Sequence, residues 1–196
     1  ETKENIRALV EYGNDRGVTI VSDEVYEHFI YGTTHWSAAR FGEDVITVNA
    51  ASKTYAMTGW RLGYLAGPKE YVEQSLKVHQ YCQACATSIS QYAALTAYTG
   101  PQDCVEQMRT EYQARRDYLC GEIARMGFSF PVPEGAFYLF APLGKGLVER
   151  ILKKGVIIVP GEAFGCNAPE YARMNYATSR ENLKIAVERI REAMEG

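Results

Sequence analysis

The sequence has no long apolar run and no excess of positive charge. Its longest apolar stretches are far shorter than the roughly 18 residues that a membrane-spanning helix needs. The formal net charge is -3 with 23% charged residues, and no basic stripe or tail stands out. The first residues, Glu-Thr-Lys-Glu-Asn, do not match a signal peptide. We therefore expect neither a nucleic acid nor a membrane as partner.

Cysteine is present but not in a pattern typical of a disulfide scaffold or a metal centre. The five cysteines are an odd number without small-scaffold spacing, which favours reduced thiols and a cytoplasmic location. Cys82 and Cys85 form one CxxC pair in a helical stretch, with no second pair and no histidine at ligand spacing. We expect two buried thiols there and no metal site. For His28, His35 and His79 we expect ordinary packed or solvated roles.

The first hundred residues have the pattern of an α/β layer. At 46% hydrophobic, the 196 residues can fill one core or two small ones, and we find no repeat or low-complexity segment. The opening helix is already under way without an initiating Met, so we expect an excised part of a longer protein. The elements predicted here are a helix over Glu1–Asp15 closed by Gly17, buried strands over Val18–Ser22 and Val45–Asn49, a third candidate strand over Leu62–Ala66, and a helical stretch over Lys69–Tyr98 that breaks near Thr87-Ser88.

The second half changes character and predicts a small α+β domain, with the boundary near Pro101. We therefore divide the chain into domains 1–100 and 101–196. The elements predicted in the second are helices over Pro101–Met126, Leu143–Lys154 and Arg180–Ala193, and strands over Phe128–Phe130, Ala136–Phe140, Val156–Val159 and Tyr171–Tyr176. For the aromatic side chains at 137, 138 and 140 we expect core filling rather than base stacking.

Four chemically distinct side chains lie just past the ends of apolar runs. Lys53 and Arg61 follow the run Val45–Val48, and Asp23 and Tyr26 follow Val18–Val21. The carboxyl edge of an open α/β sheet is where ligands bind, and the small residues before Lys53 leave room for a ring. A lysine amine forms an imine with an aldehyde, a carboxylate can hold a ring nitrogen protonated, and a guanidinium suits a phosphate. The pattern therefore indicates a phosphorylated aldehyde cofactor.

Asp23, considered by itself, fits three different roles. These are a solvated loop acid, the magnesium-binding acid of a P-loop NTPase, and the partner of a cofactor nitrogen. The NTPase interpretation requires a G-x-x-x-x-G-K-[ST] loop. The Gly144-Lys145 pair is followed by Gly146, so these residues do not supply that loop.

Several ordered motifs resemble the class I/II aminotransferases of fold type I, in their aspartate aminotransferase-like branch. The resemblance begins with Ser-Asp-Glu-Val-Tyr-Glu at 22–27 and Ser-Lys-Thr-Tyr-Ala-Met-Thr-Gly-Trp-Arg-Leu-Gly at 52–63. It continues through Pro-Glu-Gly-Ala-Phe-Tyr at 133–138, Val-Pro-Gly-Glu-Ala-Phe-Gly at 159–165 and Ala-Arg-Met-Asn-Tyr-Ala at 172–177. It covers essentially the whole chain. It implies the C-terminal part of the large cofactor-binding domain, a mostly parallel sheet with helices, plus the small domain.

The resemblance also implies a role for each residue. Lys53 would form an imine with pyridoxal 5'-phosphate and later move a proton at the substrate Cα. Asp23 would pair with the protonated ring nitrogen, and Tyr26 would bond the phenolic oxygen. Arg61 would hold the phosphate, with Ser52 among the cofactor-binding residues. Arg173 would bind the substrate α-carboxylate through its planar fork.

The implied activity is transfer of an α-amino group between an amino acid, aspartate or similar, and a 2-oxo acid, in a homodimer. Two departures bear on it. Ala50 stands where the family usually has Gly or Ser, and the family's N-terminal portion is not represented in the sequence. Three alternatives stay open: another pyridoxal-phosphate enzyme such as a β-lyase or decarboxylase, the sensing domain of a transcription regulator, and an inactive fragment.

Overall fold

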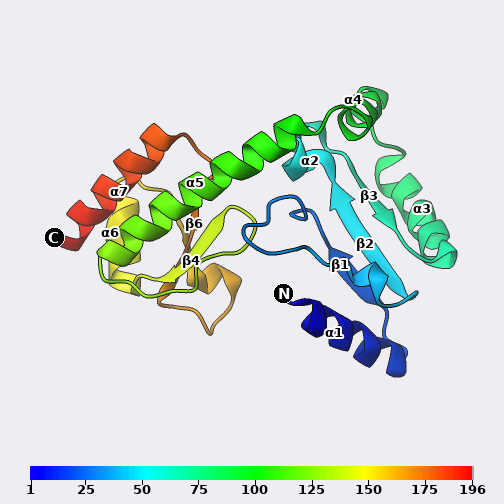
Figure 1. The fold of residues 1–196 in the computed structure, drawn as a ribbon, viewed down its shortest axis with the longest axis horizontal. Helices are drawn as coiled ribbons and strands as arrows, with labels where there is room; N and C mark the ends of the chain where they lie inside the picture. The colour runs from blue at the N-terminus through cyan, green and yellow to red at the C-terminus, as the bar shows by residue number, and fades with distance from the viewer. Residues whose placement is uncertain (196) are drawn as a thin grey trace. The chain divides into compact units, whose positions relative to one another are not determined.

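The computed structural model describes residues 1–195, which form two compact units, 1–106 and 107–195. The division falls inside the long helix α5, Asp103–Arg125. Each unit has its own three-stranded sheet (Figure 1). Of the helices in residues 1–195, none is both long enough and apolar enough to cross a bilayer.

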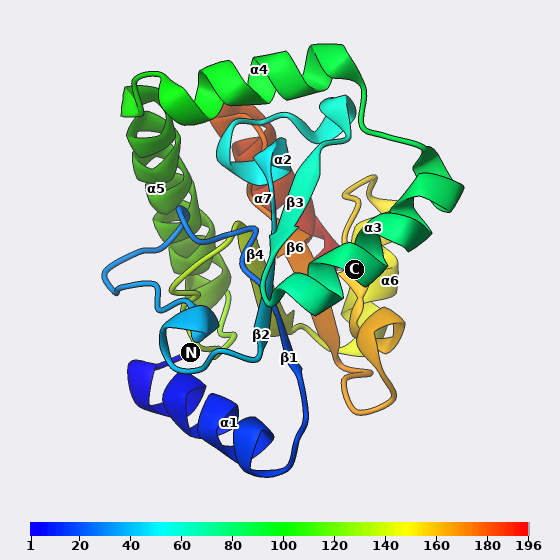
Figure 2. The same ribbon diagram turned by 90° about the vertical axis from the view of Figure 1, so that its right-hand side faces the viewer.

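The first unit contains the strands that precede the candidate site residues. Strand β1 (Ile20–Asp23) runs parallel to β2 (Val45–Ala50), and β2 runs antiparallel to β3 (Gly63–Ala66). Helix α3 runs alongside β3 (Figure 2). The remaining elements of the unit are α1 (Lys3–Asp15), η1 (Ala38–Arg40), α2 (Ala51–Thr54), η2 (Thr58–Trp60), α3 (Lys69–Gln83) and α4 (Ser88–Thr99).

Local sequence explains where the helices of this unit begin and end. The hydroxyl of Thr2 accepts a hydrogen bond from the backbone N–H of Asn5 and caps α1. Gly17 follows that helix at φ 64°, a conformation that glycine adopts without a Cβ clash. Thr87 caps α4 in the same way as Thr2 caps α1, which confirms the predicted break in the helical stretch.

The first strand is not buried on both faces, and here the prediction was wrong. Ile20 packs against a cluster of Val10, Ala38 and Val45. Val21 points to the other side and is 64% exposed. The apolar run predicted a strand covered on both faces, but Ile20 packs against this cluster while Val21 stays largely exposed.

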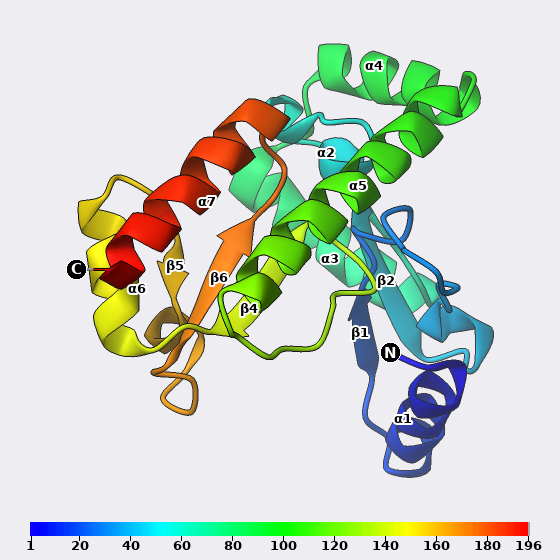
Figure 3. The same cartoon turned by 60° about the vertical axis from the view of Figure 1, so that its left-hand side comes forward.

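The second unit is a small α+β arrangement. Its sheet has the order β4-β6-β5, with both pairs antiparallel. Helices α6 and α7 lie side by side next to the sheet, as Figure 3 shows. The bounds are β4 (Tyr138–Pro142), α6 (Lys145–Lys153), β5 (Val159–Pro160), η3 (Gly161–Phe164), β6 (Tyr171–Asn175) and α7 (Arg180–Glu195).

Two predicted strands of this unit fail or shrink. Residues 128–130 form no strand, and of the expected strand over Val156–Val159 only Val159 is in a strand, the two-residue β5 (Val159–Pro160). Ile157 is 92% exposed, so an apolar, β-branched sequence did not guarantee pairing or burial. The buried core instead uses alternate residues of β4 and β6, including Leu139, Ala141 and Met174.

Candidate functional site

Asp23 lies at the carboxyl end of β1, in register with Val48 of the neighbouring parallel strand. Because β1 and β2 run in the same direction, the segments after the two strands emerge at one edge of the sheet. The Asp23 side chain is exposed. Its Oδ1 accepts a hydrogen bond from the backbone N–H of Val25, 3.2 Å away, which starts the turn carrying Tyr26.

Lys53 and Tyr26 are brought together at this edge. Lys53 belongs to the short helix α2, which is anchored by the buried side chains of Ala51 and Thr54. The Lys53 Nζ lies 5.9 Å from the centre of the Tyr26 ring. Both side chains are half-buried. Residues far apart in sequence therefore combine an amine and a phenol beyond two adjacent strands.

A buried asparagine, which none of the sequence motifs marks as functional, connects the two strand ends. Asn49 is 4% exposed, and its Nδ2 donates a hydrogen bond of 2.5 Å to Oε1 of Glu27. Its own Oδ1 accepts from the backbone N–H of Ala50 at 2.7 Å. The turn after β1 is thereby tied to the last residues of β2. The available sequence indication was a polar residue placed inside an apolar run.

Arg61 occupies a constrained loop between η2 and β3. Its backbone is left-handed, at φ 51° and ψ 49°, which for a non-glycine residue costs about 1–2 kcal/mol. Its Nη1 donates to the carbonyl oxygen of Thr58 at 2.9 Å. From helix α4, the buried Ser90 hydroxyl donates to the Trp60 carbonyl at 2.7 Å. In the part of the chain that the structure describes, and apart from the residues next to it in sequence, nothing lies within 4 Å of the position of a Cβ at Gly59, so the backbone there is open to close approach by a bound group.

A cavity of 540 Å³ opens between β2, β3 and helix α3. Ser52 and Arg61 line it together with Asn49, while Leu65 and Leu76 supply apolar walls. Small-molecule sites of this size are mostly apolar with a few polar groups that fix orientation. Arg61 also lines a second cavity of 510 Å³, on the side of helix α4.

Three tyrosines form an aromatic cluster near Glu27. The rings of Tyr55 and Tyr98 meet edge to face at 5.1 Å between centroids, and those of Tyr64 and Tyr98 at 6.0 Å. The Tyr55 hydroxyl donates to Oε1 of Gln102 at 2.8 Å. Burial, reinforced by the neighbouring phenols and Glu27, raises the pKa of Tyr98 to about 12. The neutral phenol is therefore favoured at this position far above neutral pH.

Arg173 lies on the central strand β6 of the second unit, opposite Phe140 and Val159. Its guanidinium carbon is 4.5 Å from the centre of the Tyr138 ring and 4.7 Å from that of Phe164. Such cation–π contacts hold a guanidinium in place and leave the N–H groups at its edge able to donate hydrogen bonds. The aromatic side chains at 137, 138 and 140 were expected to fill the core. Phe137 is buried, whereas Phe140 is 38% exposed.

The cysteines differ from the expectation. Cys82 and Cys85 are exposed rather than buried. Cys82 belongs to α3, which has no buried residue, and Cys85 follows the end of that helix. Cys120 is buried in α5, and burial raises the pKa of its thiol to about 11. A neutral, inaccessible thiol of this kind behaves as a small apolar side chain.

Comparisons with known proteins all lead to one family. The family model described as "Aminotransferase class I and II" matches residues 2–190. A probable aspartate aminotransferase of Methanocaldococcus jannaschii is 41% identical over 98% of this chain and 54% of its own length. The aromatic aminotransferase of Pyrococcus horikoshii OT3 superposes with a TM-score of 0.93 at 37% identity, over 100% of this chain and 56% of the other.

A second solved structure, the aspartate aminotransferase of Thermus thermophilus with maleate, has a TM-score of 0.93 at 38% identity, over 98% of this chain and 52% of the other. The chain thus spans about half the length of the relatives it matches.

Proposed function

We propose that this chain, which belongs to the class I and II aminotransferases, carries the lysine-bearing part of a pyridoxal 5'-phosphate site that transfers an α-amino group between an amino acid and a 2-oxo acid. The observation that carries the proposal is the placement of Asp23 at the carboxyl end of one strand and of Tyr26 and Lys53 just beyond the ends of this strand and its parallel neighbour. The residues fit the cofactor, because the same edge of the sheet offers an amine, a phenol and a carboxylate, with Ser52 directly before Lys53 and Arg61 in the loop that follows. Ser52 and Arg61 also line the 540 Å³ cavity, whose lining does not include Asp23, Tyr26 or Lys53.

Each side chain has a defined task in this proposal. Lys53 would bind the cofactor aldehyde covalently through Nζ. The Asp23 carboxylate would accept the hydrogen of the ring N–H, and the Tyr26 hydroxyl would donate to the phenolic oxygen. Arg61 and Ser52 would hold the phosphate, a dianion that matches the guanidinium fork. When bound, pyridoxal phosphate supplies an electron sink for the charge that develops at the substrate Cα.

Proton transfer would fall to Lys53. Once released from the cofactor, its amine would take the proton from Cα of the amino acid in the first half of the reaction. In the second half it would deliver a proton to Cα of the 2-oxo acid, which becomes the new amino acid. The Tyr26 ring beside Nζ limits where the amine can move. In the second unit, Arg173 would bind the α-carboxylate of the amino acid or the 2-oxo acid. The aromatic rings of Tyr138 and Phe164 support its guanidinium.

The amino donor belongs to the same proposal. The three relatives described above are called aspartate or aromatic aminotransferases. We propose aspartate or a similar amino acid as donor, with an aromatic amino acid as the competing substrate to be assayed beside it. A site that forms hydrogen bonds to one group of its substrate strongly rejects analogues that lack this group. The two donors should therefore differ clearly in kcat/KM.

We also propose a cytoplasmic homodimer in which residues 1–100 are part of the large domain and residues 101–196, including the connecting helix, form the small domain. The surface of helix α4 favours a dimer, because its apolar residues Ile89 and Tyr92 are 75% and 74% exposed. Apolar surface of this kind commonly marks an interface. The free thiols suit a reducing compartment.

The decisive test traps the cofactor on the natural polypeptide that contains this chain. Borohydride reduction followed by peptide mapping should recover the modified peptide with the cofactor on Lys53. Lys53→Ala should lose both the trapped cofactor and amino transfer, whereas Lys69→Ala, an exposed lysine on α3, should keep both. Trapping on another residue, or normal transfer by Lys53→Ala, would refute the proposal. Release of ammonia or carbon dioxide without 2-oxo acid dependence would favour a lyase or decarboxylase.

A further inference from the structure

The side chain of Glu24 is a buried carboxylate with several donors around it. Its residue is 6% exposed. Oε1 accepts hydrogen bonds from the hydroxyls of Ser22 and Ser37 at 2.9 and 3.0 Å and from the backbone N–H of Ala38 at 3.1 Å. Nε2 of His35 lies 3.0 Å from Oε2. The carboxylate therefore joins the end of β1 to a loop eleven to fourteen residues further along.

This environment keeps Glu24 ionised. Burial raises the pKa of Glu24, but the hydrogen bonds from His35, Ser22, Ala38 and Ser37 outweigh it and leave the pKa below the ordinary value of 4.5. An ionised carboxylate only accepts hydrogen bonds, so Nε2 of His35 carries the hydrogen in this pair. Charge-assisted bonds of this kind are stronger than neutral ones.

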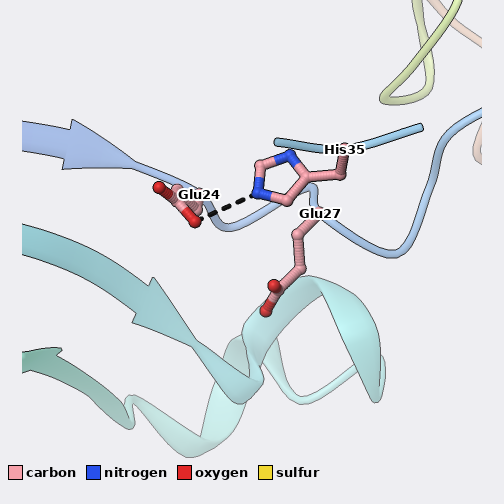
Figure 4. A group of neighbouring side chains, drawn as sticks. All are labelled: Glu24, Glu27 and His35. Atoms are coloured by element: carbon pink, nitrogen blue, oxygen red, sulfur yellow. Dashed lines mark hydrogen bonds and ion pairs between the residues drawn. The ribbon is translucent and has the colours of Figure 1, made fainter. Parts of the chain in front are cut away.

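Glu24, Glu27 and His35 offer ligand atoms within 4.8 Å of one another (Figure 4). These atoms already have hydrogen-bond partners. The Oε2 of Glu24 is bonded to His35, and an oxygen of Glu27 is bonded to the amide of Asn49. A cation would have to displace those bonds, so the group is better explained as a network that holds the backbone.

The backbone that the network holds carries two proposed cofactor ligands. The N–H of Glu24 donates to the Val48 carbonyl at 2.9 Å, which extends the β1–β2 ladder one residue past Asp23. The carbonyl of Glu24 accepts from the N–H of Glu27 at 3.0 Å and so closes the turn that contains Tyr26. Glu24 lies between Asp23 and Tyr26 in the sequence, and hydrogen bonds hold its N–H, its carbonyl and its side chain.

We propose that Glu24 is a positioning residue, whose buried carboxylate fixes the directions in which Asp23 and Tyr26 leave the sheet edge. The inference rests on the proposed function, and it identifies Glu24 as the group that holds the two proposed cofactor ligands Asp23 and Tyr26 in position. Asp23 is exposed, and its carboxylate accepts from the backbone N–H of Val25, so its aim depends on the turn rather than on packing. A misplacement of about 1 Å in such a group costs roughly 100-fold in rate.

The test compares Glu24→Gln and Ser37→Ala with Glu11→Gln, a change at an exposed glutamate of α1, in the natural polypeptide. Gln keeps the size of Glu24 but presents an NH2 group where an oxygen accepted. We expect Glu24→Gln to lower kcat about 10- to 100-fold, to weaken pyridoxal phosphate binding measured by fluorescence quenching, and to speed hydrogen exchange of the amides of residues 25–29 in the cofactor-free protein. Ser37→Ala should do the same to a smaller degree, and Glu11→Gln should change none of the three.

The readouts separate this inference from the proposed function. Unchanged exchange, cofactor affinity and kcat in Glu24→Gln, with only a lower Tm, would mean that Glu24 stabilises the fold without aiming the ligands, and would overturn the inference. If the unmodified protein never traps cofactor on Lys53, the proposed function fails. Hydrogen exchange in the cofactor-free protein then still decides whether Glu24 holds the turn: unchanged exchange overturns that part as well. Should Glu24→Gln fail to fold, Ser37→Ala carries the same three measurements.

Discussion

The Nζ of Lys53 lies 5.9 Å from the centre of the Tyr26 ring, although the two residues come after different strands. The contact exists because β1 and β2 are parallel and in register up to Asp23 and Val48. It places a hydroxyl-bearing ring beside the amine that we propose binds the cofactor. The ring and the hydroxyl can be tested separately.

Tyr26→Phe keeps the ring beside Lys53 and removes only the hydroxyl. We expect the cofactor to remain trappable on Lys53 and kcat to fall about 10- to 100-fold, as for the loss of one hydrogen bond to a charged group worth roughly 1.5–3 kcal/mol. Steady-state kinetics and borohydride trapping measure the two effects. Tyr12→Phe, at a 58% exposed position of α1, is the control and should match the unmodified protein. Full activity of Tyr26→Phe would remove Tyr26 from the site.

Gly63 permits the start of β3 to approach the end of β2. A Cβ added at Gly63 would lie 2.8 Å from the carbonyl oxygen of Asn49 and 3.2 Å from the Cβ of Ala50. Backbone cannot yield as a flexible side chain does, so Gly63→Ala should destabilise the protein by about 1–3 kcal/mol, as overpacking does. Urea unfolding measures this. Gly59→Ala is the matched control, because its added Cβ meets nothing within 4 Å, and equal stability losses in the two variants would contradict the explanation.

The sequence predicted the part of the site that depends on local order. Apolar β-branched runs located β1 and β2, and the small residues after the second run placed Lys53 in a tight connection. The carboxyl-edge rule then predicted that Asp23, Tyr26 and Lys53 lie near one another. These features need only strand direction and neighbouring residues, which periodicity and composition encode.

Other features depend on contacts between distant segments, and pattern alone could not supply them. Glu24 becomes a buried hydrogen-bond acceptor only when the loop at His35 and Ser37 folds over it. The exposure of Val21 and Cys82 depends on what packs against β1 and α3. Burial is a property of the neighbours as much as of the residue, and the apolar run at 18–21 therefore misled the prediction.

Tyr98 should make the protein sensitive to alkali. Its pKa is raised from 10.0 to about 12 by burial and by the nearby phenols and Glu27. The unfolded chain loses the Tyr98 proton from about pH 10 upward, while the folded chain keeps it. The contribution of Tyr98 to the free energy of unfolding is therefore fully present below pH 10 and is lost as the pH rises toward 12. Tyr98→Phe should flatten that part of the stability curve, measured by urea unfolding from about pH 9 to 12, with Tyr12→Phe as control. An unchanged slope would contradict the assignment.

Arg173→Lys tests the proposed carboxylate-binding role in the second unit. Lysine keeps the positive charge but loses the planar fork and its stacking between the rings of Tyr138 and Phe164. We expect KM for the amino donor and for the 2-oxo acid to rise together, by about 10- to 100-fold, because both substrates present an α-carboxylate and a charged hydrogen bond is worth roughly 1.5–3 kcal/mol. Cofactor trapping on Lys53 should be unaffected, since this change leaves the residues proposed to hold the cofactor intact. Arg189→Lys, an exposed position of α7, should leave both KM values unchanged. A rise in KM for only one of the two substrates would instead assign Arg173 to the side chain of that substrate.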